Sequence, residues 1–307
     1  MKIDFANLNK AYKKDKILLD KSINTVLEDC NFIMGRQVYE LEDELCRFSG
    51  ARYCISCSNG TDALLLAMMA LGIGVGDEVI TTTFTFISTA ETIAFLGAKP
   101  VFVDIDEKTY NIDASKIEEK INKNTKAIIP VSLFGQMSQM EKINKIANIN
   151  NLTVIEDAAQ SFGATQNNLV SCNYSKLATT SFFPAKPLGC FGDGGAVFTN
   201  DKSLYDKIKS LRIHGQTKKY YHKYIGMGGR LDTIQAAILN VKLKDYKNDI
   251  IKRQNIASIY SKLLNGLIET IPYVSKNNTS VWAQYCIRVK NRDEIQYLLK
   301  QKGIPTA

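Results

Sequence analysis

The sequence predicts an α/β fold built on a mostly parallel sheet that helices cover on both faces. Short apolar runs alternate with helical patterns over the first two thirds of the chain, which is typical of a parallel sheet with crossover helices. Of the 307 residues, 45% are hydrophobic and 23% are charged, as in an average soluble globular protein. This composition excludes a disordered or collagen-like chain, and the length predicts a large domain plus a smaller one.

The expected strands and helices follow one another in regular order. We expect strands at residues 53–56, 78–81, 100–103, 127–131 and 152–155, and helices at 61–71, 87–96 and 114–121. Ser138 and Glu141 have the spacing of a capping box, which predicts the start of a further helix. Strands at 177–183 and 195–199 follow, without a full helix between them.

Beyond residue 201 the chain becomes more polar and mainly helical. Helices are expected at 204–211 and over a long stretch from 232 to 264, followed by a strand at 281–289 and a helix at 293–301. One strand and one helix make a poor domain. We therefore expect a large domain over residues 1–245 and an incomplete small α/β domain over 246–307.

The basic residues are scattered rather than clustered. Lys and Arg total 39 against 31 Asp and Glu, which gives a net charge of +8 and a pI near 9.0. No nucleic-acid-binding motif accompanies this excess, so a solvated surface is favoured and an anionic ligand is compatible. The sequence has no apolar signal core and no run approaching a membrane span. A cytoplasmic protein with no nucleic-acid or membrane partner is expected.

The cysteines indicate reduced thiols and no metal site. Their number, seven, is odd, and the CxxC spacing of Cys54 and Cys57 has no second pair and only two histidines in the chain to complete a zinc site. The surrounding sequence is strand-like, so small buried thiols are expected.

Three polar segments follow predicted strands, at the edge of an open α/β sheet where ligands bind. The first, Cys57 to Asp62, connects a strand to a helix. Gly60 allows close approach to the unpaired N–H groups of the helix N-terminus, where a phosphate could bind. An ordinary helix cap formed by Ser58 or Asn59 is the alternative.

The other two segments carry an isolated carboxylate and an isolated amine. Asp157 ends an apolar strand, where it could hold a cationic ring nitrogen or simply cap the next turn. Lys186 is the only charged residue from 177 through 192. Apolar surroundings disfavour the charged ammonium, as a Schiff-base lysine requires. The alternative is a lysine whose stem packs while its head reaches water.

Together these features fit pyridoxal 5'-phosphate (PLP). Its aldehyde reacts with a lysine, its pyridinium needs an acidic partner, and its phosphate favours a helix N-terminus. Phe86, which follows the second predicted strand, could stack on the pyridine ring. The combination indicates a PLP site more strongly than any single residue does.

The sequence resembles the sugar aminotransferases of the DegT/DnrJ/StrS family, which have the aspartate aminotransferase type I fold. The resemblance runs from the first residues to the end of the chain. Its motifs are Ser58-Asn-Gly-Thr-Asp-Ala-Leu64, Thr83-Phe-Thr-Phe-Ile-Ser-Thr89, Glu156-Asp-Ala-Ala-Gln160, Ser181-Phe-Phe-Pro-Ala-Lys186, Gly192-Asp-Gly-Gly195 and Gly229-Arg-Leu-Asp-Thr-Ile-Gln-Ala-Ala237.

The resemblance implies a role for each candidate residue. Lys186 would bond to the cofactor aldehyde and later move the proton between donor carbon and cofactor. The resemblance also implies a homodimer with shared active sites, in which the 226–230 loop reaches the partner's site and Arg230 binds the anionic part of the substrate. The remaining cofactor contacts would be Asp157 to the ring nitrogen, Gln160 near the phenolic oxygen, Phe86 on the ring face, and Ser181 with Gly60 and the backbone of Thr61 and Asp62 around the phosphate.

Two departures from the family pattern affect these expectations. Gly228 stands where relatives carry an asparagine that touches the partner's phosphate, so that role is not transferred. Relatives also continue past residues 303–306 into a segment that completes the small domain, which is why an incomplete domain is expected here.

The expected reaction is transfer of an amino group from glutamate to a keto group of a nucleotide-linked sugar, for surface polysaccharide or lipopolysaccharide biosynthesis. Segments 171–173, 187–190 and 224–230 resemble the branch that aminates C3 of a 3-keto sugar, such as a UDP-2-acetamido-3-keto-hexuronic acid. A PLP-dependent sugar dehydratase is one alternative, although that branch has histidine in place of Lys186. A non-catalytic protein that binds PLP or sugar nucleotides, and a nicotinamide-dependent oxidoreductase, are the others. For His214 and His222, local surface roles are expected.

Overall fold

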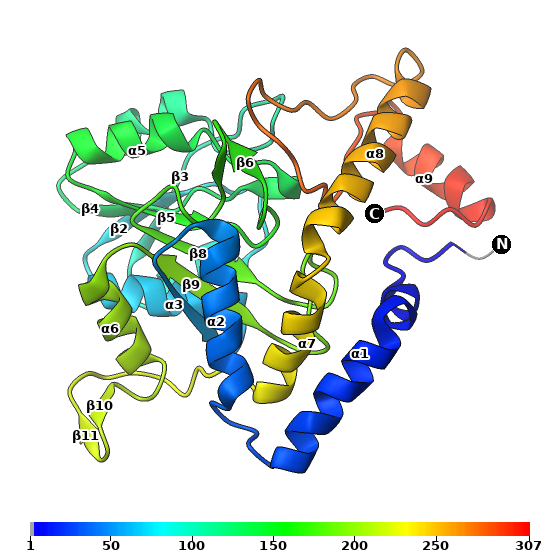
Figure 1. Cartoon of the computed structure of the whole chain (residues 1–307). Helices are drawn as coiled ribbons and strands as arrows, with labels where there is room; N and C mark the ends of the chain where they lie inside the picture. The colour runs from blue at the N-terminus through cyan, green and yellow to red at the C-terminus, as the bar shows by residue number, and fades with distance from the viewer. Residues whose placement is uncertain (1–2) are drawn as a thin grey trace.

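The computed structural model describes residues 3–307, so residues 1 and 2 of the predicted large domain lie outside the described residues. Its centre is a seven-stranded sheet in the order β1-β9-β8-β5-β4-β2-β3 (Figure 1). Within this sheet β9 runs against both of its neighbours and the other strands are parallel, which confirms the expected mostly parallel α/β class. The strands are β1 (Tyr53–Cys57), β2 (Glu78–Thr81), β3 (Lys99–Phe102), β4 (Thr125–Ile128), β5 (Thr153–Asp157), β8 (Leu177–Ser181) and β9 (Gly195–Thr199).

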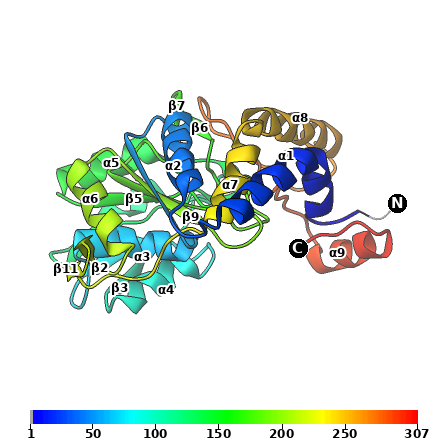
Figure 2. The ribbon, with the colours of Figure 1, turned by 60° about the horizontal axis from the view of Figure 1, so that its bottom comes forward.

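Helices cover both faces of the sheet because successive strand residues point to opposite sides. On β1, Cys54 packs into one apolar core and Ile55 into the other. Helices α2, α5 and α7 contribute to the first core, and α3, α4 and α6 to the second; Figure 2 shows α2 and α5 opposite α3 and α4. The helices are α1 (Leu8–Asp29), α2 (Arg36–Ser49), α3 (Gly60–Leu71), α4 (Ser88–Phe95), α5 (Met140–Ile149), α6 (Lys202–Leu211), α7 (Thr233–Leu243), α8 (Tyr246–Leu264) and α9 (Arg292–Gln301).

The same alternation explains the CxxC motif. Cys54 and Cys57 are an odd number of positions apart on β1, so their thiols lie in opposite cores and cannot share a metal. Both are free and buried, and burial raises the pKa of each thiol, as expected for inert thiols. Residues 3–307 contain no group of His, Cys, Asp and Glu side chains that could hold a metal ion.

The expected helix at 114–121 is wrong. The segment forms two short 3-10 turns, η1 (Ala114–Lys116) and η2 (Glu118–Lys120). Its buried residues Ala114 and Ile117 are three positions apart, which suits a helix with three residues per turn.

The capping box at 138–141 is also wrong. α5 begins at Met140 with no side-chain cap, because the Ser138 hydroxyl donates to the carbonyl of Val131 at 3.0 Å. The N–H of Glu141 donates to Gln166, which lies 25 residues away. Partners distant in sequence therefore replace the local cap.

The C-terminal part departs most from expectation. The helical stretch 232–264 is divided into α7 and α8, and the expected strand at 281–289 does not form. Val281 is instead fully buried, and its N–H donates to the carbonyl of Gly135 at 2.9 Å, so this apolar segment docks on the sheet domain. The helix expected at 293–301 is confirmed as α9. The division at residue 245 stays a prediction.

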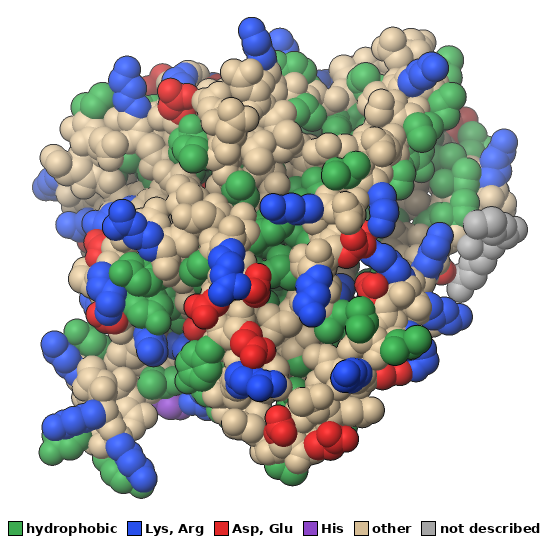
Figure 3. Space-filling view, viewed as in Figure 1, with side chains coloured by type: hydrophobic (Ala, Val, Ile, Leu, Met, Phe, Trp, Pro, Cys, Tyr) green, Lys and Arg blue, Asp and Glu red, His purple; other side chains and the backbone are tan. Residues whose placement is uncertain are grey.

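Some elements were not predicted. They are the helices α1 and α2, of which α1 packs along α7, and two short hairpins. One hairpin pairs β6 (Thr165–Gln166) with β7 (Leu169–Val170), and the other pairs β10 (Gln216–Lys218) with β11 (Tyr221–His222). On the face seen in Figure 3, lysines and arginines are spread over the surface among acidic side chains rather than gathered in one stripe. No helix of the described residues is long and apolar enough to cross a membrane.

Candidate active site

The site lies where the carboxyl ends of the parallel strands meet, beginning at the junction of β1 and α3. Asn59 caps α3, and its side-chain oxygen accepts the N–H of Asp62 at 2.7 Å. The cap that was the alternative to a phosphate site therefore exists. It uses the Asp62 N–H but leaves the N–H groups of Gly60 and Thr61 without a hydrogen bond among residues 3–307. These two groups point out of the helix N-terminus, where an anion is stabilised.

Ser181 closes this N-terminus from the end of β8. A Cβ atom on Gly60 would lie 2.7 Å from the Cβ of Ser181, so only glycine allows the helix start and the strand end to come this close. The hydroxyl of Thr61 is 2.6 Å from that of Ser88, at the first turn of α4. We call Gly60, Thr61, Ser88 and Ser181 the α3 cradle; hydroxyl and N–H donors gathered in this way suit a phosphate.

Asp157 lies at the end of β5 and is 5% exposed. Its carboxylate accepts hydrogen bonds from the Thr89 hydroxyl at 2.9 Å and from the Ala159 N–H at 3.1 Å. Burial raises the pKa of Asp157, while these two donors and the charge of Lys186 lower it in part. A cation beside the carboxylate would stabilise its ionised form, which is the property that a pyridinium partner needs.

Lys186 follows β8 in a turn, where its backbone N–H donates to the carbonyl of Phe183 at 2.8 Å. Its side-chain nitrogen makes no hydrogen bond or ion pair with any residue from 3 to 307. Burial lowers the pKa of Lys186, and the charge of Asp157 raises it in part. The structure thus brings Lys186 within electrostatic range of Asp157, with an unpaired amine whose neutral form burial favours.

Gln160 and Phe86 lie at the same edge of the sheet. The side-chain oxygen of Gln160 accepts the N–H of Phe134 at 2.9 Å, and Phe134 has a left-handed backbone with φ of 59°. The Phe134 ring packs with those of Phe84 and Tyr110, with centroids 5.8 to 6.2 Å apart. Phe86 is 70% exposed. Its stacking on a cofactor ring stays a prediction.

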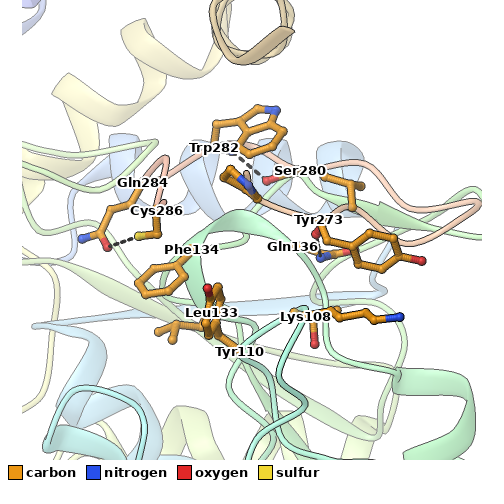
Figure 4. A pocket seen from close by; sticks show the side chains of 13 residues that line it. Lys108, Tyr110, Leu133, Phe134, Gln136, Tyr273, Ser280, Trp282, Gln284 and Cys286 are labelled. Atoms are coloured by element: carbon orange, nitrogen blue, oxygen red, sulfur yellow. Dashed lines mark hydrogen bonds between the residues drawn. The ribbon is translucent and has the colours of Figure 1, made fainter. Parts of the chain in front are cut away.

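A pocket lies between Phe134, whose N–H donates to Gln160, and the C-terminal segment at residues 272–286 (Figure 4). Tyr110 and Phe134 form its floor, and Trp282 faces them from the docked segment. A Cβ on Gly135 would lie 2.6 Å from the backbone nitrogen of Trp282, so the turn and the segment are in close contact. The C-terminal segment therefore packs against the turn that contains Phe134, the residue hydrogen-bonded to Gln160.

Arg230 lies in a loop that is hydrogen-bonded to the turn preceding α3 in its own chain. The carbonyl of Gly229 accepts the N–H of Ser58 at 3.1 Å, which places the 226–230 loop beside the start of α3. Within residues 3–307 the Arg230 guanidinium has no hydrogen bond or ion pair. A Cβ at Gly228 would lie 3.1 Å from the ring of His214, so this ring occupies the space beside Gly228.

The two histidines have local contacts. The ring nitrogen Nδ1 of His222 is 2.9 Å from the carbonyl oxygen of His214, across the β10–β11 arm. The N–H of His214 donates to Met227. Both residues therefore shape the loop that carries Arg230.

The residues present fit PLP. The α3 cradle offers free N–H and hydroxyl donors for a phosphate, Asp157 offers a buried carboxylate for a ring nitrogen, and Lys186 offers an unpaired amine for an aldehyde. Thr89 and Ser88 were not assigned roles from the sequence. The signal that could have found them is their place in the first turn of a helix that follows a central strand.

Comparisons with known proteins found relatives that match nearly the whole chain. The chain is 52% identical over 305 residues to UDP-2-acetamido-2-deoxy-3-oxo-D-glucuronate aminotransferase of Pseudomonas aeruginosa, a match that covers 99% of this chain and 85% of the relative. It is 44% identical to a pleiotropic regulatory protein of Geobacillus stearothermophilus, over 100% of this chain and 83% of that one.

A solved structure has the same fold as this chain. The crystal structure of DesV from S. venezuelae in complex with a ketimine intermediate superposes with a TM-score of 0.97 at 34% identity, and the match covers 98% of this chain and 82% of that one. Residues 14–307 match the model of the DegT/DnrJ/EryC1/StrS aminotransferase family. The chain therefore belongs to the DegT/DnrJ/EryC1/StrS family of PLP-dependent aminotransferases.

Proposed function

We propose that this protein transfers an amino group from glutamate to a keto group of a nucleotide-linked sugar. Glutamate would leave as 2-oxoglutarate, and the keto carbon of the sugar would become an amine-bearing carbon. The observation that carries the proposal is the partly buried amine of Lys186, which has no partner among residues 3–307 and interacts electrostatically with the buried carboxylate of Asp157. A dehydratase of this family would have histidine at that position.

The residues of the site divide the work of this reaction. Bound PLP supplies an electron sink for the carbanion that forms when a proton leaves the amino-bearing carbon. Burial keeps the pKa of Lys186 low, so the amine is available to take up that proton and return it. Thr89 and the Ala159 N–H hold the Asp157 carboxylate in one orientation. The α3 cradle would hold the phosphate through the N–H groups of Gly60 and Thr61 and the hydroxyl groups beside them.

The acceptor we propose is a UDP-linked 3-keto hexose or hexuronic acid. The P. aeruginosa relative is named for such a substrate, UDP-2-acetamido-2-deoxy-3-oxo-D-glucuronate. The guanidinium of Arg230, which has no partner in the described part of the chain, is suited to a carboxylate or phosphate of this class. The net charge of +8 favours anionic ligands. The product would serve surface polysaccharide or lipopolysaccharide synthesis in the cytoplasm.

We also propose a homodimer in which the 226–230 loop reaches the partner's site, with the preceding segment around β10 and β11 as an arm against the partner. Ile225 on this arm is 92% exposed and Tyr220 is 80% exposed. Large apolar side chains on a projecting arm are typical of an interaction surface.

Spectroscopy of purified protein with PLP tests the cofactor role. The wild type should develop the absorbance band that PLP shows when its aldehyde is bonded to a lysine amine, and Lys186→Ala should abolish it. Lys242→Met is the matched control, because burial also lowers the pKa of Lys242 but its amine donates to the carbonyl of Gly189. Loss of the band in the control, or its persistence in Lys186→Ala, contradicts the assignment.

A transfer assay separates an enzyme from a regulator. With PLP, glutamate and a UDP-linked 3-keto sugar, the wild type should form 2-oxoglutarate and the amino sugar in equal amounts. A protein that binds PLP and the sugar nucleotide without turnover would support a regulatory role, in line with the name of the Geobacillus relative.

A further inference from the structure

Arg212 is a buried cation that the proposed reaction does not use. It directly follows α6 and is 1% exposed. Its Nη1 donates to Oε1 of Glu42 at 2.5 Å and to the carbonyl of Ser56 at 2.7 Å. Buried ion pairs contribute little net stability, whereas their geometry can fix how elements meet. Arg212 lies too deep to touch a substrate, so any role in the reaction is indirect.

The side chain of Arg212 connects α2 to the end of β1. Glu42 is on α2, and the same Oε1 atom also accepts the N–H of Ser56 at 2.9 Å and its hydroxyl at 2.8 Å. Ser56 lies two residues before Ser58, where the turn into α3 begins. Arg212 and Glu42 therefore hold the strand end from which the α3 cradle starts.

The backbone of Arg212 reaches the same turn by a second route. Its carbonyl accepts the N–H of Gly229 at 2.9 Å, and the carbonyl of Gly229 accepts the N–H of Ser58 at 3.1 Å. The two routes close a ring of contacts from Arg212 through Ser56, Ser58 and Gly229 back to Arg212. This ring joins the start of the α3 cradle to the residue before Arg230.

We infer that Arg212, with Glu42, is a positioning residue that sets the α3 cradle for phosphate binding and holds it in register with the Arg230 loop. This inference rests on the proposed function, because the ligand of the cradle is taken to be the phosphate of PLP. Hydrogen bonds weaken steeply when their distance or angle changes. A small displacement of the Ser58 turn would therefore weaken the N–H contacts of Gly60 and Thr61 with a phosphate. Lys186 lies outside the ring, so its reaction with an aldehyde would be unaffected.

The test compares the affinities of PLP and pyridoxal, which lacks the phosphate. Both aldehydes can bond to Lys186, so the ratio of their dissociation constants isolates the phosphate contribution. Arg212→Lys keeps the charge, but a flexible lysine amine cannot reproduce the fixed position of Nη1 on the planar guanidinium, the atom that contacts both Glu42 and Ser56. We expect it to reduce the preference for PLP over pyridoxal at least tenfold, with pyridoxal affinity within twofold of wild type. The absorbance maximum of bound PLP should not move.

Glu42→Gln provides a second variant that keeps the acceptor oxygen and removes the charge. It should also reduce the preference for PLP over pyridoxal, by at least threefold. Arg288→Lys is the matched control, since Arg288 pairs with Glu107 near the C-terminal segment. It should keep the wild-type ratio. General destabilisation would weaken both aldehydes equally, and that outcome would overturn the inference.

The outcomes also separate this inference from the proposed function. Suppose that the wild type forms the PLP band and prefers PLP to pyridoxal, but that Arg212→Lys and Glu42→Gln have the same ratio of dissociation constants as the wild type. The positioning role of Arg212 is then wrong, and the proposed function stands. If the wild type binds neither aldehyde, the proposed function fails and the inference fails with it.

Discussion

Two adjacent carboxylates on β5 show how single residues acquire different chemistry in this site. Asp157 faces donors from α4 and the following turn, whereas Glu156 is fully buried and accepts the N–H of Cys172 at 2.9 Å and the Ser132 hydroxyl at 3.4 Å. Burial raises the pKa of Glu156 to about 7, although both donors lower it in part. Glu156 therefore gains a proton near neutral pH, and Asp157 is left as the carboxylate that can face a cation.

Glu156→Gln should change how the stability of the protein depends on pH. The native state binds a proton at Glu156 that the unfolded chain releases above its ordinary pKa of 4.5, so the contribution of this proton is present below pH 4.5 and is lost as pH rises through about 7. The loss is on the order of 3 kcal/mol. Glutamine does not ionise, so the variant should gain stability over the wild type between pH 5 and pH 8 in urea unfolding.

The control for this prediction is Glu118→Gln, at an exposed position of η2. It should follow the wild-type pH profile. A Glu156→Gln variant whose stability differs from wild type by the same amount at both pH values would show that Glu156 does not titrate in this range.

At the scale of residues, the sequence alone revealed those functional groups whose unusual setting is visible in the neighbouring residues of the chain. Lys186 is conspicuous because no other charge lies near it in the sequence, and Asp157 because it ends an apolar run. Thr89 was not found because its partner is 68 residues away, and Arg212 because Glu42 is 170 residues away. Only the fold brings such pairs together.

At the scale of elements, the junction of β1, α3 and β8 depends on one glycine. Gly60→Ala should weaken PLP binding tenfold or more and lower the free energy of unfolding by about 1–3 kcal/mol, because the added methyl group must displace Ser181. Titration with PLP and urea unfolding measure the two effects. Gly74→Ala is the matched control, since its nearest atom would be the Leu96 carbonyl oxygen at 3.8 Å. Wild-type PLP affinity in Gly60→Ala would exclude the close packing of this junction.

Elements were predictable where a local pattern determines them. The strands at 78–81 and 195–199 have the predicted bounds, because each is a short run with apolar residues at its centre between polar turns. The order of strands in the sheet was not predictable from one-dimensional patterns. The apolar run at 281–289 was read as a strand, whereas its hydrophobicity serves docking on the Gly135 turn. Burial produces the same pattern in both cases.

At the scale of the whole molecule, the proposed homodimer predicts which subunit supplies Arg230 to each proposed active site. Its loop is bound to Ser58 of its own chain through Gly229, while the adjacent arm exposes Ile225 and Tyr220. These features are compatible with a loop that starts at one site and extends toward a partner. In a homodimer with shared sites, Lys186 and Arg230 of one working site come from different subunits.

Mixing two inactive variants decides this arrangement. Lys186→Ala and Arg230→Ala should each lose activity, the first completely and the second at least tenfold. If sites are shared, a heterodimer of the two variants contains one site with Lys186 from one subunit and Arg230 from the other, so refolding an equal mixture should restore up to about a quarter of wild-type turnover. If each subunit completes its own site, no heterodimer site has both residues, and the mixture stays as inactive as its parts. Size-exclusion chromatography of the same mixture measures the dimer directly, so absence of recovery in a dimeric mixture would assign Arg230 to the site of its own chain.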